Sequence, residues 1–168
     1  MNEMLMQDLL DRQKTLLLGK YRGTVVAVDP ATMRIQAVVP AALGSVPTGW
    51  CLPCVPYAGP NVGFFILPDI GSNVWIEFEQ GDVDFPIWTG CFWSAGEIPA
   101  GVSATVKSVV TNAGTLSFDN GAGSVTLSDT SQDSLVFDAS GATLSAGSGK
   151  IEVGASGVSV NSGALQVT

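Results

Sequence analysis

Short apolar-alternating segments, separated by Gly, Ser, Asn or Asp, recur from Thr115 to the end of the chain. Each places about two apolar side chains on one face of a strand and Ser, Thr or Gly on the other, because strand side chains alternate. A strand this short buries too little apolar surface to offset its ordering entropy, so it needs stacked neighbours. The leading apolar residues, seven to ten positions apart, are Leu116, Val125, Leu135, Ala142, Ile151, Val158 and Leu165.

Stacked short strands of this kind fit two architectures, a single-chain β-solenoid and a trimeric intertwined β-helix. The rungs are thin, and few of their residues are large, so one chain would enclose only a narrow core. We therefore favour the trimer, a stiff and narrow needle with a core shared by three copies. The residues expected in that core are Val125, Leu127, Leu135, Phe137, Ile151 and Val153.

Composition excludes several classes of function. The net charge of −8 and pI of about 4.1 argue against nucleic acid, whose phosphates require Lys and Arg. No run of apolar residues is long enough for a transmembrane helix, and the N-terminus has no basic region typical of a signal peptide. Synthesis in the cytoplasm without a signal peptide is expected. Only 13% of the residues are charged, which is typical of a chain covered by partners or by copies of itself.

The segment 1–19 is predicted to form a helix. Asn2 is a suitable N-cap, and leucines follow at helical spacing as far as Gly19, a plausible C-cap. An isolated helix of this length is marginal in water, so its apolar stripe must pack on its own domain or dock on a partner. The leucines of this candidate docking surface are Leu5, Leu9, Leu10, Leu16 and Leu17.

The segment 20–96 is predicted to be a small closed β-barrel of the OB type, with about five strands and a long middle loop. Apolar runs separated by Pro and Gly predict its strands. A composition shift over 96–105 marks a domain boundary, because aromatic residues become rare after it. The chain is therefore expected to be all-β apart from its first helix, with the needle over 97–168. The predicted barrel strands are 24–28, 33–39, 63–67, 73–78 and 86–92, with a short extended piece at 50–56.

The barrel resembles the OB domain of contractile-tail spike proteins, which include the phage baseplate assembly protein V family and the VgrG spikes of type VI secretion. The resemblance rests on an ordered set of anchors across 68–90: Pro68, Gly71, Val74, Phe78, Gly81, Asp82, Pro86 and Gly90. Matching pieces precede it at 23–30, 34–40 and 56–59. Members of this family follow the OB domain with a trimeric β-helix, as the repeat in this chain also indicates.

The resemblance implies a structural role without catalysis, as the homotrimeric, membrane-piercing spike of a contractile particle. It places the chain at the tip of a virion or particle baseplate, joined to a separate hub protein, with transient contact to a target cell envelope. Many related spikes close their apex around a His-x-His iron site, whereas this chain contains no His. A separate PAAR-like tip protein is therefore expected on Leu165, Val167 and Thr168.

Residues with potential for chemistry have structural explanations. Cys51-Leu52-Pro53-Cys54 has the spacing of redox proteins, but it lies among prolines and strands without a βαβ pattern. A metal site on these cysteines and Cys91 would lack a fourth ligand. The acidic group Glu77, Glu79, Asp82 and Asp84 fits acid–base or Ca²⁺ chemistry, yet a solvated strand face is the simpler interpretation. No cofactor and no enzyme activity are expected.

One alternative comes from another class of function. OB barrels also bind oligosaccharides and oligonucleotides. The negative charge disfavours the oligonucleotide, but a trimeric carbohydrate-binding adhesin with an OB-fold head remains an alternative to the spike.

Overall fold

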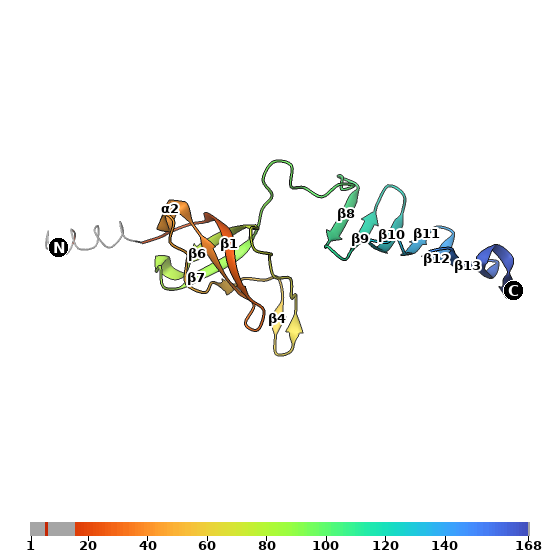
Figure 1. The fold of residues 1–168 in the computed structure, drawn as a ribbon, viewed down its shortest axis with the longest axis horizontal. Helices are drawn as coiled ribbons and strands as arrows, with labels where there is room; N and C mark the ends of the chain where they lie inside the picture. The colour runs from red at the N-terminus through yellow and green to blue at the C-terminus, as the bar shows by residue number, and fades with distance from the viewer. Residues whose placement is uncertain (1–5, 7–15, 168) are drawn as a thin grey trace. The chain divides into compact units, whose positions relative to one another are not determined.

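The computed structural model describes residue 6 and residues 16–167. The chain divides into two compact units between Gly96 and Glu97 (Figure 1). The first is a β-barrel and the second a β-meander. No helix among the described residues has the length and apolar character that a membrane span requires.

The barrel is built on a five-stranded sheet of order β2-β1-β6-β7-β3. A bridge between Ile35 and Cys51, with the Cys51 N–H donating to the Ile35 carbonyl at 2.8 Å, joins the two edges and closes it. β4 and β5 form a separate hairpin. The elements of this unit are β1 (Tyr21–Asp29), β2 (Arg34–Val38), α2 (Pro40–Leu43), β3 (Leu52–Pro53), β4 (Ala58–Gly59), β5 (Val62–Gly63), β6 (Asn73–Phe78), η1 (Glu79–Gly81) and β7 (Pro86–Cys91).

Alternating residues of β1, β2, β6 and β7 fill the barrel interior. On β6, for example, Val74, Ile76 and Phe78 are buried while the residues between them are half-buried. Thr48 is a buried polar residue, and its hydroxyl accepts a hydrogen bond from the Ala37 N–H at 3.1 Å. The buried apolar residues are Val25, Ile35, Ala37, Val39, Cys51, Val74, Ile76, Phe78 and Trp88.

Two predictions for the first unit are wrong at particular residues. The helix was expected to continue through residue 18, but residues 16–18 lie outside helices and strands. There the Leu17 N–H donates to the Gly81 carbonyl at 2.9 Å instead of continuing a helical pattern. Over the predicted strand 63–67, only Gly63 belongs to a strand, and Phe64, Phe65 and Ile66 are exposed in a loop. An apolar run without polar alternation does not require a paired strand.

The second unit is an eight-stranded antiparallel sheet in which each strand pairs with its neighbours in sequence, from β8 to β15. Figure 1 shows the labelled strands β8 to β13 following one another in chain order along the unit. Each copy therefore contributes a whole sheet. The elements are β8 (Val106–Val110), β9 (Gly114–Asp119), β10 (Ser124–Asp129), β11 (Ser134–Asp138), β12 (Gly141–Ala146), β13 (Gly149–Gly154), β14 (Gly157–Val160), η2 (Asn161–Gly163) and β15 (Leu165–Val167).

Candidate functional site

One face of the C-terminal sheet is largely apolar, and Lys107 on β8 is the charged residue in its ladders among the described residues. Leu127 pairs directly with Leu116 and Leu135, and Val125 pairs with Phe118 and Phe137. Directly paired residues share a face, as do residues two apart on one strand, so these two ladders lie side by side. The first ladder is Val109, Leu116, Leu127, Leu135, Leu144, Ile151, Val160 and Leu165, and the second contains Phe118, Val125, Phe137, Ala142, Val153 and Val158.

The other face of the same sheet is largely polar. Its central ladder runs through paired Ser117, Thr126, Val136, Thr143, Glu152 and Ser159. Glu152 forms an ion pair with Lys150 at 2.6 Å, and both side chains are exposed, so the pair adds little stability. Small hydroxyl side chains in this position are suited to contact with water. The sheet is therefore amphipathic, with the apolar ladders on one side only.

The apolar face is not covered within one copy. Among the residues of this unit with described side chains, none is buried. Leu127 is 54% exposed, and Phe137 and Val153 are 50% and 48% exposed. A soluble protein rarely leaves so continuous an apolar surface open to water. This face therefore requires other polypeptide chains to cover it.

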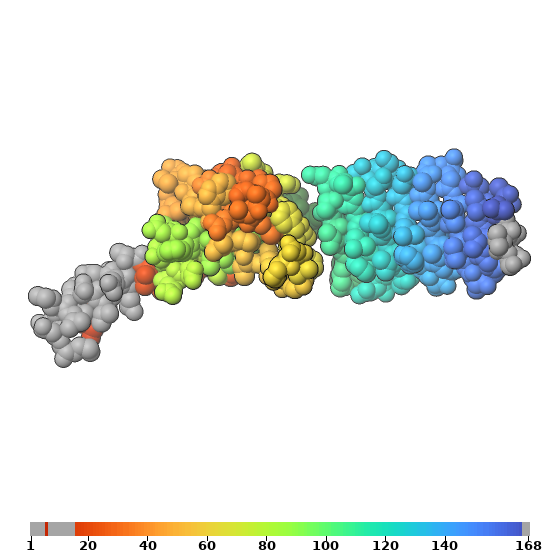
Figure 2. All heavy atoms as spheres, turned by 90° about the horizontal axis from the view of Figure 1, so that it is seen from below, coloured from red at the N-terminus to blue at the C-terminus, as the bar shows by residue number. Residues whose placement is uncertain are grey.

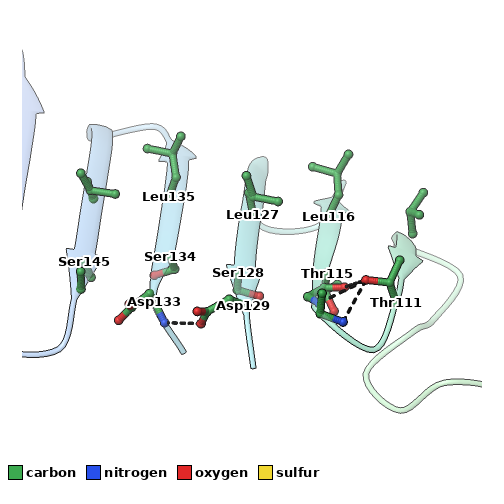
Figure 3. Close-up of a pocket in the computed structure, with 15 residues that line it drawn as sticks. Thr111, Thr115, Leu116, Leu127, Ser128, Asp129, Asp133, Ser134, Leu135 and Ser145 are labelled. Atoms are coloured by element: carbon green, nitrogen blue, oxygen red, sulfur yellow. Dashed lines mark hydrogen bonds between the residues drawn. The ribbon is translucent and has the colours of Figure 1, made fainter. Parts of the chain in front are cut away.

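A groove of about 650 Å³ runs along part of this face. In Figure 3, Leu116, Leu127 and Leu135 come from three adjacent strands and project on the same side. The groove is open along its length and has no enclosing wall from its own chain. Its shape and apolar lining are suited to side chains from another sheet of the same kind, because apolar surfaces stabilise an assembly in proportion to the area removed from water.

Turns with Asp caps hold the strands in register. The Asp129 carboxylate accepts a hydrogen bond from the Ser131 N–H at 2.8 Å and another from the Asp133 N–H at 2.9 Å, and Figure 3 shows the second of these. At the next turn, hydrogen bonds from Ser140 hold the pKa of the Asp138 carboxyl below its usual range. Asp in such positions stabilises a turn by bonding its own backbone. The turns fix which residues reach the apolar face.

The structure places all six residues predicted for the needle core on the apolar face. Val125 pairs with Phe137, and Leu127 pairs with Leu135. Ile151 and Val153 belong to the same two ladders through Leu144 and Ala142. Sequence reasoning did not select the other members of the ladders, although the same alternation could have identified them. These additional residues are Val109, Leu116, Phe118, Leu144, Val158 and Val160.

The candidate tip residues lie at the last strand. β15 is one edge of the described sheet, and Leu165 is 59% exposed and pairs with Val160. The backbone of Val167 pairs with that of Val158. Thr168 lies outside the described residues.

The structure describes two of the five candidate hub-docking leucines, and these two differ in their surroundings. Leu5, Leu9 and Leu10 lie outside the described residues. Leu17 packs partly buried against the barrel core, so this residue contacts its own domain. Leu16 is 39% exposed next to it.

The acidic residues at the end of β6 are not arranged as a metal centre. Within the described part of the chain, no group of three or more His, Cys, Asp or Glu side chains is placed to hold a metal ion. Glu77 instead pairs with Lys20 at 2.7 Å. The Asp82 carboxylate accepts a hydrogen bond from the Asp84 N–H at 3.0 Å, as in an ordinary turn.

The three cysteines are free and differ in environment. Cys51 is fully buried beside the Thr48 hydroxyl, and burial raises the pKa of its thiol, which disfavours the reactive thiolate. Cys54 and Cys91 are exposed.

Cys54→Ser and Cys91→Ser, alone or together, are expected to leave trimer assembly unchanged, because neither thiol is part of the barrel core. Cys51→Ser serves as the contrasting variant, since it adds a more polar group to the buried interior and is expected to lower the melting temperature. Thermal unfolding and native mass spectrometry provide the measurements. A loss of assembly in the double variant with folding preserved would restore a redox role.

Comparisons with known protein families match both units. Residues 21–93 match the type VI secretion system/phage-baseplate injector OB domain. Residues 103–166 match the phage baseplate V C-terminal trimerisation domain. A search of curated proteins gave no match. The two matched segments cover the barrel and the meander described above.

Proposed function

The chain belongs to the phage baseplate V family, and on this premise we propose that it forms the central spike of a contractile injection machine. Three copies close their apolar faces into one prism, which is the membrane-piercing needle. The OB barrels join the needle to a hub protein of the baseplate. The observation that carries this proposal is the apolar face of the C-terminal sheet, which no described residue of its own unit covers and which coincides with a trimerisation domain.

The proposed mechanism is mechanical and involves no catalysis. Contraction of the particle drives the needle against a target envelope, and a narrow trimer concentrates that force on a small area. A Ser- and Thr-rich outer face with net negative charge supports rapid passage, because it offers few cations to anionic lipid headgroups. The shared core supports stiffness, since each copy loses its apolar contacts if the prism opens.

The proposed trimer predicts the mass of the protein in solution. Three chains of 17.3 kDa should migrate as one particle of about three times that mass, since the apolar face is covered only in the assembly. Native mass spectrometry and light scattering measure this directly. A stable monomer with native β content would contradict the proposal.

We place the hub contact on the N-terminal side of the barrel. Leu5, Leu9, Leu10 and Leu16 are the proposed hub-facing residues, whereas Leu17 anchors the segment to its own barrel. The hydrogen bond from the Leu17 N–H to the Gly81 carbonyl supports this division, because it holds Leu17 on its own barrel.

We further propose that a small tip protein of the PAAR kind covers the C-terminal end of the needle through Leu165, Val167 and Thr168. β15 presents an edge of the sheet, and an unpaired edge offers backbone N–H and C=O groups for further pairing. The exposed Leu165 adds an apolar contact. Three copies would present three such edges together.

Deletion of residues 164–168 is expected to abolish binding of the tip protein while preserving the trimer, because the other strands keep their pairing. Wild type and deletion variant are compared in a pull-down with the small proteins encoded beside this chain, each purified and identified. Leu165→Ser is the matched point variant. If the deletion retains every partner that wild type binds, the tip proposal is wrong.

A further inference from the structure

A second exposed apolar surface lies on the barrel unit, at the β4–β5 hairpin and the loop that follows it. Every residue from 56 to 66 is exposed. We call the apolar side chains of this segment the hairpin surface. They are Tyr57 at 54%, Val62 at 53%, Phe64 at 56%, Phe65 at 62% and Ile66 at 61% exposed.

The sequence around the hairpin surface contains no charge. Between Arg34 and Asp69 the chain has no Asp, Glu, Lys or Arg. Depletion of charge together with enrichment of aromatic residues is typical of the buried centre of a protein interface. Contiguous exposed apolar side chains likewise mark interaction sites. The hairpin surface is therefore suited to a protein partner.

The hairpin surface is held by a defined backbone. Ala58 pairs with Gly63 and Gly59 with Val62, and the Phe64 N–H donates to the Tyr57 carbonyl at 2.9 Å. Gly63 is required here, because a Cβ at this position would lie 2.8 Å from the Tyr57 carbonyl oxygen. A preorganised surface loses less conformational entropy when it binds.

The position of the hairpin within the barrel unit favours a partner other than the hub. Figure 1 shows the hairpin projecting from the barrel at the end opposite to Leu16–Leu18, where the chain enters it. β7, the last strand of the barrel, runs toward the end that carries the hairpin (Figure 1). Figure 2 also shows the hairpin on the surface of the unit, at the end away from Leu16–Leu18. The hairpin thus lies at the end from which the chain continues to the trimerisation domain.

We propose that the hairpin surface packs on the barrel of a neighbouring copy, so that three barrels form a closed ring. This inference rests on the homotrimer of the proposed function. The trimerisation domain begins at residue 103, soon after the barrel ends, and therefore holds three hairpins at high effective concentration. A hairpin that binds a different surface of the next copy gives a head-to-tail contact, which closes after three copies.

The barrel also offers exposed apolar side chains that can receive a neighbour's hairpin. Val46 is 63% exposed and Trp93 64%, and both lie outside the hairpin surface. A ring of this kind would make the three barrels one rigid collar at the base of the needle. Axial force would then be transmitted by the collar and not by three independent linkers.

Site-specific photocross-linking in the full-length protein tests the ring. Phe65 is replaced by p-benzoylphenylalanine, the purified protein is irradiated, and the products are boiled in SDS. Covalent dimers and trimers are expected, with the cross-linked peptides of the second copy inside residues 16–96. The matched control carries the same probe at the exposed Asp84, in a polar turn, and is expected to remain monomeric after boiling.

A second variant removes the contact without touching the trimerisation domain. Phe64→Ser combined with Phe65→Ser, with the probe at Val62, is expected to lose the cross-links and to keep the trimeric mass. A wild-type trimer that gives no cross-links between copies overturns the ring and leaves the proposed function standing. A monomeric protein overturns both. Cross-links found only to another baseplate protein in the assembled particle assign the hairpin surface to that protein and overturn the ring.

Discussion

Val153→Asp is expected to abolish the SDS-resistant trimer. Val153 lies on the apolar face between Ala142 and Val158, so three copies would bring three carboxylates to one level of the shared core. A buried unpaired charge costs several kcal/mol, of the order of the whole stability of a small domain. The measurement is gel migration with and without boiling, together with mass in solution. Val125→Asp, on another strand of the same ladder, is expected to give the same loss.

Thr126→Asp is the matched control for this prediction. Thr126 follows Val125 on β10 but belongs to the polar face, where its paired neighbours are Ser117 and Val136. A carboxylate there remains in water, so the trimer is expected to persist. If Val153→Asp assembles as well as wild type, or if Thr126→Asp is the more damaging change, the apolar face does not point to the shared core.

Gly141→Ala is expected to produce the second large effect. Gly141 begins β12 with φ of +134°, a backbone conformation that side chains rarely adopt, and an added Cβ would clash with the Val153 carbonyl oxygen. Strain and overpacking together cost about 2–5 kcal/mol per copy. Three copies carry this cost at one level of the needle. The temperature at which the trimer dissociates in SDS is expected to fall sharply.

Gly121→Ala separates this clash from a general effect of replacing glycine. Gly121 lies in the turn between β9 and β10, and its added Cβ would lie 3.2 Å from an Asp119 carboxylate oxygen and at ordinary contact distance, 3.8 Å, from the Thr105 hydroxyl. This variant is expected to dissociate within a few degrees of wild type. Equal dissociation temperatures for the Gly141 and Gly121 variants would contradict the register of β12 and β13.

The strands of the second unit were predictable because their alternation and turn residues agree. Each predicted segment from Thr115 onward corresponds to one of the strands β9 to β15. β8 was not predicted, since Val106–Val110 lies next to the presumed linker and carries Lys107 on the apolar face, opposite Phe118. The sequence alone also could not predict the strand order of the sheet, in which strands that pair with each other are consecutive along the chain.

The OB-type barrel was predictable from the ordered anchor residues across 68–90. The conformation of the segment before them was not predictable. Gly63–Leu67 has the composition of a buried strand, yet in the barrel Phe64, Phe65 and Ile66 are exposed. Apolar composition indicates that a segment will be removed from water. It does not tell whether the segment is buried in the core of its own domain or on the surface of a neighbouring copy. The prediction for the end of the N-terminal helix failed for a related reason, because Leu17 is apolar but lies outside any helix and its N–H donates to the Gly81 carbonyl.

The pairing of every strand in the second unit with its sequence neighbours has a consequence for the kinetics of assembly. Contacts between residues close in sequence form quickly, because little loop entropy is lost before they are made. Each sheet can therefore form hairpin by hairpin before it meets another copy, and the slow steps become the successive second-order encounters that join three chains. The time during which the apolar ladders face water is then set by protein concentration, and it is longest where the chain is most dilute.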